Sequence, residues 1–288
     1  MNDFRDYRLD VPGDVMPLRL DAFLAEHLPL SRRRIRTAID DGGVYVNRRR
    51  CRKAGRLLKG GEKLRLVLLE NEQHIPFSPE QLVWTEPPLY LIHKRSGQYA
   101  QEALHRSLGT LPDELAQHLQ LAADARRLLR PVHRLDHGTS GLMLLSSDPA
   151  QLQHLQDHWH SHVSKEYLAV VEPAPAWETQ YIALPVSKLG DRHGRYPIHN
   201  DGRPCETDAT VLERRKNRAL LRLIPHTGRT HQLRVHLSAL GCPILGDHRY
   251  GGRPHHRLML HAHMLAVQAP AMDREHRWQV DPEEDWKW

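Results

Sequence analysis

Short strand-like segments dominate this 288-residue chain from residue 82 onward and constrain its fold more than any other feature. These segments are apolar or alternate between apolar and polar residues, which is typical of β-strands. They come in runs, without the regular alternation with helices that a parallel sheet requires. We therefore predict an α+β architecture with a mixed or antiparallel sheet. The strand-like segments are 82–84, 89–94, 142–145, 165–171, 207–212, 219–224 and 258–267.

Helical spacing of apolar residues is confined to a few segments. We predict helices over 20–28, 31–41, 113–129, 149–159 and 230–240. Ser31 and Thr230 precede apolar periodicity and predict N-caps, while Gly42 and Gly241 stand where helices end.

The positive charge of the chain is concentrated near its N-terminus. The net charge is +6, yet residues 31–66 contain thirteen Lys/Arg against three Asp/Glu. A solvated surface would mix the two signs. A neutral body with one basic segment instead indicates a polyanionic partner such as RNA, whose phosphates attract Lys and Arg.

Residues 17–70 resemble the S4-like RNA-binding module. Two short helices, a glycine turn, the strand "VYVN" and the strand "KGGEKLRL" follow one another in that order. The resemblance implies a small α/β domain that binds RNA through its basic face. The candidate RNA-binding residues are Arg32, Arg33, Arg34, Arg36, Arg48, Arg49, Arg50, Arg52 and Lys53. A basic helix pair that binds nothing is the alternative.

This module suggests a division of the chain into four parts. We predict a loose extension over 1–16, the S4-like domain over 17–70, a linker over 71–81 and a catalytic domain over 82–288. The linker is indicated by two prolines and a serine in a polar stretch.

Composition places the protein in a reducing, aqueous compartment. The apolar fraction is 40%, and no apolar run reaches the ~20 residues that span a bilayer. The N-terminus lacks the apolar core of a signal peptide. The three cysteines, Cys51, Cys205 and Cys242, are far apart and form no CxxC pair. We expect a cytoplasmic protein.

A carboxylate lies in a dense polar stretch at the middle of the chain. The stretch "HRLDHGTSG" places Asp136 two residues after Arg134 and just before the apolar run 142–145, which predicts a buried strand. A neighbouring guanidinium would keep the carboxylate ionised at neutral pH. Two interpretations remain open at this point, a catalytic group or an ion pair that only fixes a loop.

A second dense stretch, "TGRTHQLRVHLSALG", covers residues 227–241. Leu233, Leu237 and Leu240 form an apolar stripe on the helix predicted there. Arg229 comes just before that helix, where main-chain N–H groups already favour an anion.

The segments "HRLDHGTSGLML", "KEYLAVV" and "TGRTHQLRVHLSALGCPILGD" together resemble the RluA-type pseudouridine synthases. The resemblance implies an isomerase that converts uridine in structured RNA to pseudouridine without a cofactor. Asp136 would be the catalytic aspartate, acting on the ribose carbon that bears the base. Either a covalent adduct or abstraction of a ribose proton would fit.

The same resemblance assigns further roles. Tyr167 would stack on the target base and help remove its C5 proton, and Arg229 would pair with Asp136. Arg134 would help to evert the nucleotide, as a base that reacts must leave its stack.

Three more residues are candidates for substrate binding. Leu258 and Leu260 could form an apolar wall against the base, or could be ordinary core residues. Lys94 opens the sequence Lys94-Arg95-Ser96-Gly97, where the family usually has a proline after the lysine. The missing proline leaves the position of Lys94 open.

Two other functions are alternatives. A metal-dependent hydrolase would use histidines, but His231 and His236 are five residues apart and diverge on a helix, whereas a helical zinc pair needs a spacing of four. We expect no metal site. The other candidates for ligands were His133, His137, His261 and His263.

The second alternative is a non-catalytic RNA-binding or RNA chaperone protein built on the same fold. The presence of Asp136, Tyr167 and Arg229 together favours the enzyme. The S4-like module favours ribosomal RNA over transfer RNA as the substrate, and a monomer is the simplest assembly.

Overall fold

The computed structural model describes residues 4–14, 17–70, 73–191, 194–268 and 274–288. The chain divides into two compact units. The first consists of Met1–Pro76 and Gln101–Leu115, and the second of Phe77–Ala100 and Ala116–Trp288. None of the helices in these described ranges has the length and apolar character that crossing a membrane requires.

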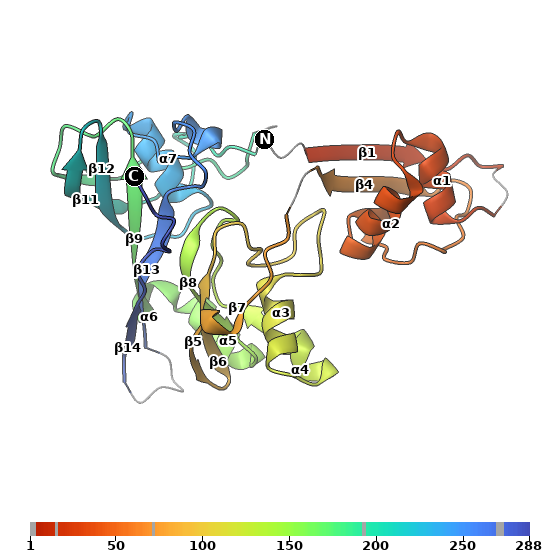
Figure 1. Ribbon diagram of the computed structural model, residues 1–288, viewed down its shortest axis with the longest axis horizontal. Coiled ribbons are helices and arrows are strands. Elements are labelled where there is room, and N and C mark those ends of the chain that lie inside the picture. The colour runs from red at the N-terminus through yellow and green to blue at the C-terminus, as the bar shows by residue number, and fades with distance from the viewer. Residues whose placement is uncertain (1–3, 15–16, 71–72, 192–193, 269–273) are drawn as a thin grey trace. The chain divides into compact units, whose positions relative to one another are not determined.

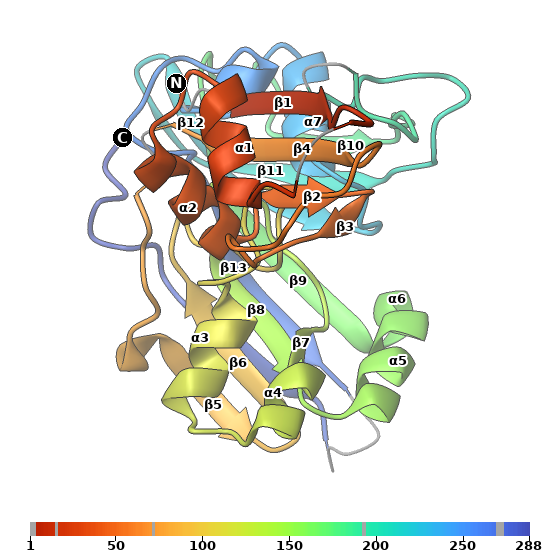
Figure 2. The ribbon, with the colours of Figure 1, turned by 90° about the vertical axis from the view of Figure 1, so that its right-hand side faces the viewer.

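The first unit contains the two helices labelled α1 and α2 in Figure 1 and a four-stranded antiparallel sheet, whose order β1-β4-β2-β3 is visible in Figure 2. Its elements are β1 (Phe4–Asp10), α1 (Leu20–His27), α2 (Arg32–Asp41), β2 (Val44–Val46), β3 (Arg49–Arg50) and β4 (Lys63–Leu69). The predicted cap of α2 is confirmed, because Ser31 Oγ accepts from Arg34 N at 3.2 Å. Gly42 ends the helix with φ 91°, a left-handed conformation that glycine adopts without strain.

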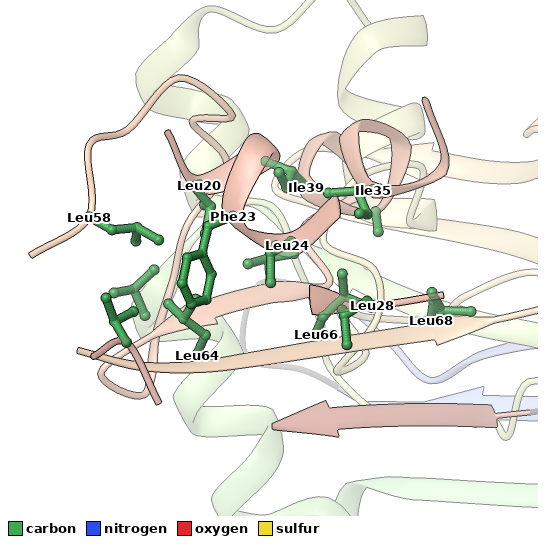
Figure 3. Packing of buried hydrophobic residues seen from close by; sticks show 14 residues of the cluster. Leu20, Phe23, Leu24, Leu28, Ile35, Ile39, Leu58, Leu64, Leu66 and Leu68 are labelled. Atoms are coloured by element: carbon green, nitrogen blue, oxygen red, sulfur yellow. The ribbon is translucent and has the colours of Figure 1, made fainter. Parts of the chain in front are cut away.

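The two helices pack on one face of this sheet. Figure 3 shows Phe23 and Leu24 of α1 pointing toward Leu64 and Leu66 of β4, with Ile35 of α2 beside them. All five side chains are at most 3% exposed. The apolar spacing seen in the sequence therefore corresponds to one continuous core.

The prediction of a loose extension over 1–16 is wrong for residues 4–10. Strand β1 pairs with β4 in antiparallel register from Phe4↔Leu69 to Asp10↔Lys63. Tyr7 and Leu9 pack against the core of the unit. The alternation of these two residues was the available signal, but it is short and flanked by charges. Residues 1–3 and 15–16 lie outside the described residues.

The domain boundaries also differ from those predicted. Residues 101–115, expected within the catalytic domain, belong to the first unit. Ser107 N donates to Asp41 O at 2.6 Å, and Tyr45 Oη donates to Leu104 O at 2.9 Å. The predicted linker 71–81 also contains a short 3-10 helix, η1 (Pro79–Gln81), which belongs to the second unit. Residues 71–72 lie outside the described residues.

The second unit is built on a ten-stranded mixed sheet, which confirms the predicted α+β class (Figures 1 and 2). The strand order is β10-β11-β12-β9-β13-β8-β6-β5, with β14 paired to β13 and β7 paired to β8. The β13–β8 pair is parallel and the other pairs of this sheet are antiparallel. The strands are β5 (Leu82–Glu86), β6 (Leu89–Lys94), β7 (Arg130–Pro131), β8 (Ser140–Ser146), β9 (Val163–Val171), β10 (Thr179–Ile182), β11 (Thr207–Arg215), β12 (Arg218–Pro225), β13 (Leu260–Val267) and β14 (His276–Gln279).

The helices after residue 110 are short. They are α3 (Leu111–His118), α4 (Ala123–Leu128), α5 (Pro149–Asp157), α6 (Trp159–His162) and α7 (Gln232–Ala239), with the 3-10 helix η2 (His248–Tyr250). The single helix predicted over 113–129 is wrong, because Gln120 adopts φ 52° and an α-helix cannot continue through that conformation. Asp148 caps α5 by accepting from Gln151 N at 2.6 Å.

Strand β8 lies inside the sheet between β13 and β6, and every one of its residues is buried. Leu142 and Leu144 pack with Leu155 of α5. Near the start of the strand, Gly141 has φ 113° and lies so close to β13 that an added Cβ would stand 2.2 Å from Ala262 O. Only glycine fits there. The segment before β8 is thus held at a fixed position on the edge of the core.

Candidate active site

A pocket of about 380 Å³ opens in the second unit, beside the loop that precedes β8. Its volume is within the usual range for small-molecule sites. The walls come from the loop 132–139, helices α5 and α6, strand β9 and the segment that begins α7. The lining residues used below are Arg134, Asp136, Trp159, Lys165, Tyr167, Gly228, Arg229, His231, Arg234 and Leu260.

Asp136 forms an ion pair with Arg234 of α7. Arg234 Nη1 donates to Asp136 Oδ2 at 2.9 Å. The same guanidinium donates from Nε and Nη2 to the two oxygens of buried Asp247, at 2.7 and 2.8 Å. This bidentate pair fixes the plane of the guanidinium, so its remaining edge is directed at Asp136.

The surroundings keep Asp136 ionised. Burial acts to raise the pKa of this carboxyl, but His231, protonated at the low pH where the carboxyl titrates, and Arg234 outweigh it and lower the pKa below its ordinary value. Burial also lowers the pKa of His231 to about 4. The imidazole is therefore neutral at pH 7, and Arg234 supplies the compensating charge.

The predicted pairing of Arg229 with Asp136 is wrong. The guanidinium of Arg229 lines the pocket, and its Nε donates to Pro204 O at 3.5 Å. The predicted cap by Thr230 is also wrong: the helix begins at Gln232, and His231 precedes it with φ 58°. Gln232 Oε1 accepts from Arg229 N at 3.0 Å. With the helix beginning at Gln232, it is Arg234, five residues after Arg229, that faces the carboxylate.

Tyr167 and Leu260 both line the pocket. Their contact with a base stays a prediction. Burial and the charge of Asp136 raise the pKa of the Tyr167 hydroxyl, which therefore stays protonated at neutral pH. Leu258 is not among the pocket-lining residues, and packs beside Gly138 of the loop 132–139. Of the two predicted leucines, the structure brings only Leu260 to the site.

Lys94 does not reach the pocket, contrary to the prediction that it binds substrate. Its fully buried ammonium donates to three carbonyl oxygens, those of Arg95, His137 and Thr139, at 3.1, 2.9 and 2.7 Å. Three acceptors match the three N–H bonds of an ammonium group. Lys94 thus fixes the loop that carries Asp136 from behind.

The turn after Lys94 is held without the proline usual in the resembling family. Ser96 Oγ donates to Gly138 O at 2.8 Å, and Gly97 N donates to His137 O at 2.8 Å. These two bonds join the turn to the same loop that Lys94 holds.

The basic residues of the first unit fall into two groups. Five have partners within the protein. Arg32 and Arg36 donate to buried Asp21, and Arg34, Arg50 and Arg52 donate to the carbonyl oxygens of Leu69, Ala103 and Asp40. The other four candidates present exposed side chains and are Arg33, Arg48, Arg49 and Lys53.

The six histidines weighed as metal ligands do not gather. One other group within the described ranges, His93, His261 and Glu283, has ligand atoms within 4.8 Å of one another. His261 Nδ1 bonds Ser140 Oγ and Nε2 bonds Val280 O, at 2.8 and 3.0 Å. Arg257 Nη1 also lies 2.9 Å from Glu283 Oε2. A metal ion would meet two occupied nitrogens and a guanidinium, so the group does not support a metal site.

Two pocket residues and one supporting residue had no role in the sequence analysis. Arg234 lies within the quoted second stretch, and Lys165 lies two residues before Tyr167, on the same side of a strand. That two-residue spacing could have identified Lys165. Nothing in the sequence links Asp247 to Arg234.

Comparison with known proteins agrees with this geometry. The family model described as RNA pseudouridylate synthase matches residues 88–239, and the S4 domain model matches residues 18–64. The chain belongs to the RNA pseudouridylate synthase family. The matched span contains the pocket residues of this pseudouridylate synthase from Arg134 to Arg234, and a separate match identifies its S4 domain.

Relatives of this pseudouridylate synthase cover most of its length. Ribosomal large subunit pseudouridine synthase D of Pasteurella multocida (strain Pm70) is 32% identical over 242 residues, covering 82% of this chain and 74% of the relative. The Escherichia coli (strain K12) protein of the same name is 31% identical, covering 93% and 88%. The structure of human RNA Pseudouridylate Synthase Domain Containing 1 matches with a TM-score of 0.60 and 26% identity, covering 72% of this chain and 86% of that one.

Proposed function

We propose that this chain isomerises uridine to pseudouridine in structured ribosomal RNA, with Asp136 as the catalytic aspartate. The observation that carries the proposal is an ionised Asp136, paired with Arg234, on the wall of a pocket that Tyr167 and Leu260 also line. The names of the relatives support ribosomal RNA, as does the S4 domain.

The reaction breaks the bond between ribose C1′ and uracil N1 and forms a bond between C1′ and C5. The proton lost at C5 is balanced by one gained at N1, so no cofactor is consumed. Asp136 can serve as a nucleophile toward C1′ or as a base toward a ribose proton, and both roles require the carboxylate that Arg234 maintains.

The pocket would receive a base that has left its stack. The ring of Tyr167 and the side chain of Leu260 offer apolar surfaces to that base. Because the Tyr167 hydroxyl stays protonated, this side chain is suited to packing and hydrogen bonding. Arg134 is exposed at the pocket and would contact the RNA strand, and Arg229 offers a second cation there. The unpaired cysteines fit a reducing cytoplasm, and we expect a monomer.

The test maps pseudouridines in ribosomal and transfer RNA from cells that lack the gene and from cells complemented with variants. We expect at least one ribosomal pseudouridine to disappear on deletion, to return with the wild type and to stay absent with Asp136→Asn. Asp201→Asn is the matched control, because the Asp201 side chain is 94% exposed. An unchanged pseudouridine map, with RNA bound but unmodified by the purified protein, would instead favour the non-catalytic RNA-binding alternative.

A further inference from the structure

Lys165 is a cation of the pocket that the mechanism above does not use. It lies on β9 two residues before Tyr167, so both side chains leave the strand on the same side. Its ammonium lies 5.7 Å from the centre of the Trp159 ring. It also lies 3.5 Å from the position that a Cβ atom would take at Gly228. Both neighbours line the pocket.

The charge of Lys165 is not compensated. Burial alone lowers the pKa of this ammonium to about 8, with no contribution from Asp136 or any other carboxylate. Within the described ranges, no hydrogen bond or ion pair joins Nζ to a protein group. By contrast, Arg234 is held between two carboxylates. Lys165 is half-buried, and a partly desolvated cation without a counterion is disfavoured unless a ligand supplies the opposite charge.

The other cations of the pocket point to the same ligand. Arg134 and Arg229 line it as well, and Asp136 is the sole carboxylate among its lining residues. Asp136 is already paired with Arg234. A strand of RNA brings one negative charge at each phosphodiester, and an everted nucleotide carries its own linkages toward the pocket.

We propose that Lys165 binds a phosphodiester oxygen of the everted target nucleotide, and that this contact draws the nucleotide into the pocket. The proposal rests on the proposed function, because it requires RNA as the substrate. Lys165 is thus a binding residue, separate from the Asp136–Arg234 pair that serves the chemistry.

The experiment uses a short RNA that contains the target uridine. Each phosphodiester next to this uridine is replaced in turn by an uncharged methylphosphonate. Binding and single-turnover rates are measured for the full chain and for Lys165→Met, with Lys188→Met as control because Lys188 is exposed and outside the pocket. We expect Lys165→Met to weaken binding roughly 10- to 100-fold. The methylphosphonate at one linkage should weaken wild-type binding similarly and have no further effect on the variant.

The pH dependence gives an independent readout from the wild type alone. Lys165 loses its proton as the pH rises through about 8. The affinity of the wild type for the natural RNA should therefore fall above that pH. Its affinity for the RNA with a methylphosphonate at the affected linkage should not. This comparison still decides the question if Lys165→Met does not fold.

Two results would overturn the proposal. In the first, the losses of RNA affinity caused by Lys165→Met and by a methylphosphonate are additive at every linkage. In the second, Lys165→Met slows the single-turnover rate and leaves RNA affinity unchanged, which would indicate proton transfer by Lys165. A wild-type protein that modifies no RNA would refute the proposed function instead.

Discussion

At the scale of single residues, the site depends on which arginine faces Asp136. Arg234 faces the carboxylate because Asp247, buried beside it, holds two of its nitrogens. Arg229 lies in the same pocket without a carboxylate partner among the described residues. The two arginines should therefore have separable effects, one on the charge of Asp136 and the other on RNA binding.

Replacing Arg234 should raise the pKa of Asp136. Burial favours the protonated carboxyl, and Arg234→Met removes the charge that opposes it. Because Asp136 acts as the carboxylate, the acid limb of the single-turnover rate should move to higher pH, by roughly one to three units. Arg229→Met should weaken RNA binding and leave the acid limb in place. Equal movement of the limb in both variants would contradict this assignment.

At the scale of elements, the loop 132–139 is held by the turn that follows β6. Lys94 and Ser96 together bond the carbonyl oxygens of His137, Gly138 and Thr139. The loop position, and with it the direction of Asp136, is therefore set by a strand that contributes no residue to the pocket lining.

Removing the lysine should loosen this loop without removing a group that contacts RNA. Lys94→Met removes one donor from each of three carbonyl oxygens, of which that of His137 still accepts from Gly97 N, at a cost of about 1–3 kcal/mol in the free energy of unfolding. We expect the single-turnover rate to fall roughly 10-fold or more while the Kd for RNA stays nearly constant. Lys216→Met, at an exposed turn, is the control for denaturant unfolding and for kinetics. A large rise in Kd with an unchanged rate would return Lys94 to substrate binding.

At the scale of the whole molecule, positive charge is concentrated in the S4 domain while the chemistry belongs to the second unit. Not every arginine of the basic segment is available to RNA: Arg32 and Arg36 are bound to Asp21, together with Arg19. A Glu at either position would disrupt this cluster, so a loss of RNA affinity could not be separated from a loss of stability. Arg33 and Arg49 are exposed and suit the test better.

Arg33→Glu with Arg49→Glu should weaken RNA binding and make it less sensitive to salt. Each lost phosphate contact lowers the slope of log K against log salt by about 0.7–0.9, so the pair should lower it by roughly 1.4–1.8. The single-turnover rate on a saturating short RNA should be nearly unchanged. Arg126→Glu with Arg127→Glu, exposed on α4, is the control. An equal loss of rate would contradict separate roles for the two units.

Local sequence pattern was enough to predict several features of the fold. Alternating and continuous apolar runs predicted the strands, because side chains of a strand alternate between its faces. The helix over Arg32–Asp41 followed from Ser31 and Gly42, whose effects act within one turn. Asp136 and Tyr167 were identified from motifs long enough to be distinctive, and the structure brings them to one pocket.

Other features depend on contacts between distant segments and could not be predicted from local pattern. Strand β1 exists because β4, more than fifty residues later, offers it a free edge. Lys94 supports the loop from behind, since its three acceptors lie at residues 95, 137 and 139. Arg234 is the partner of Asp136 because α7 begins at Gln232 and Asp247 orients the guanidinium. A side chain's direction depends on where its helix starts and what packs beside it, and neither can be derived from residue spacing alone.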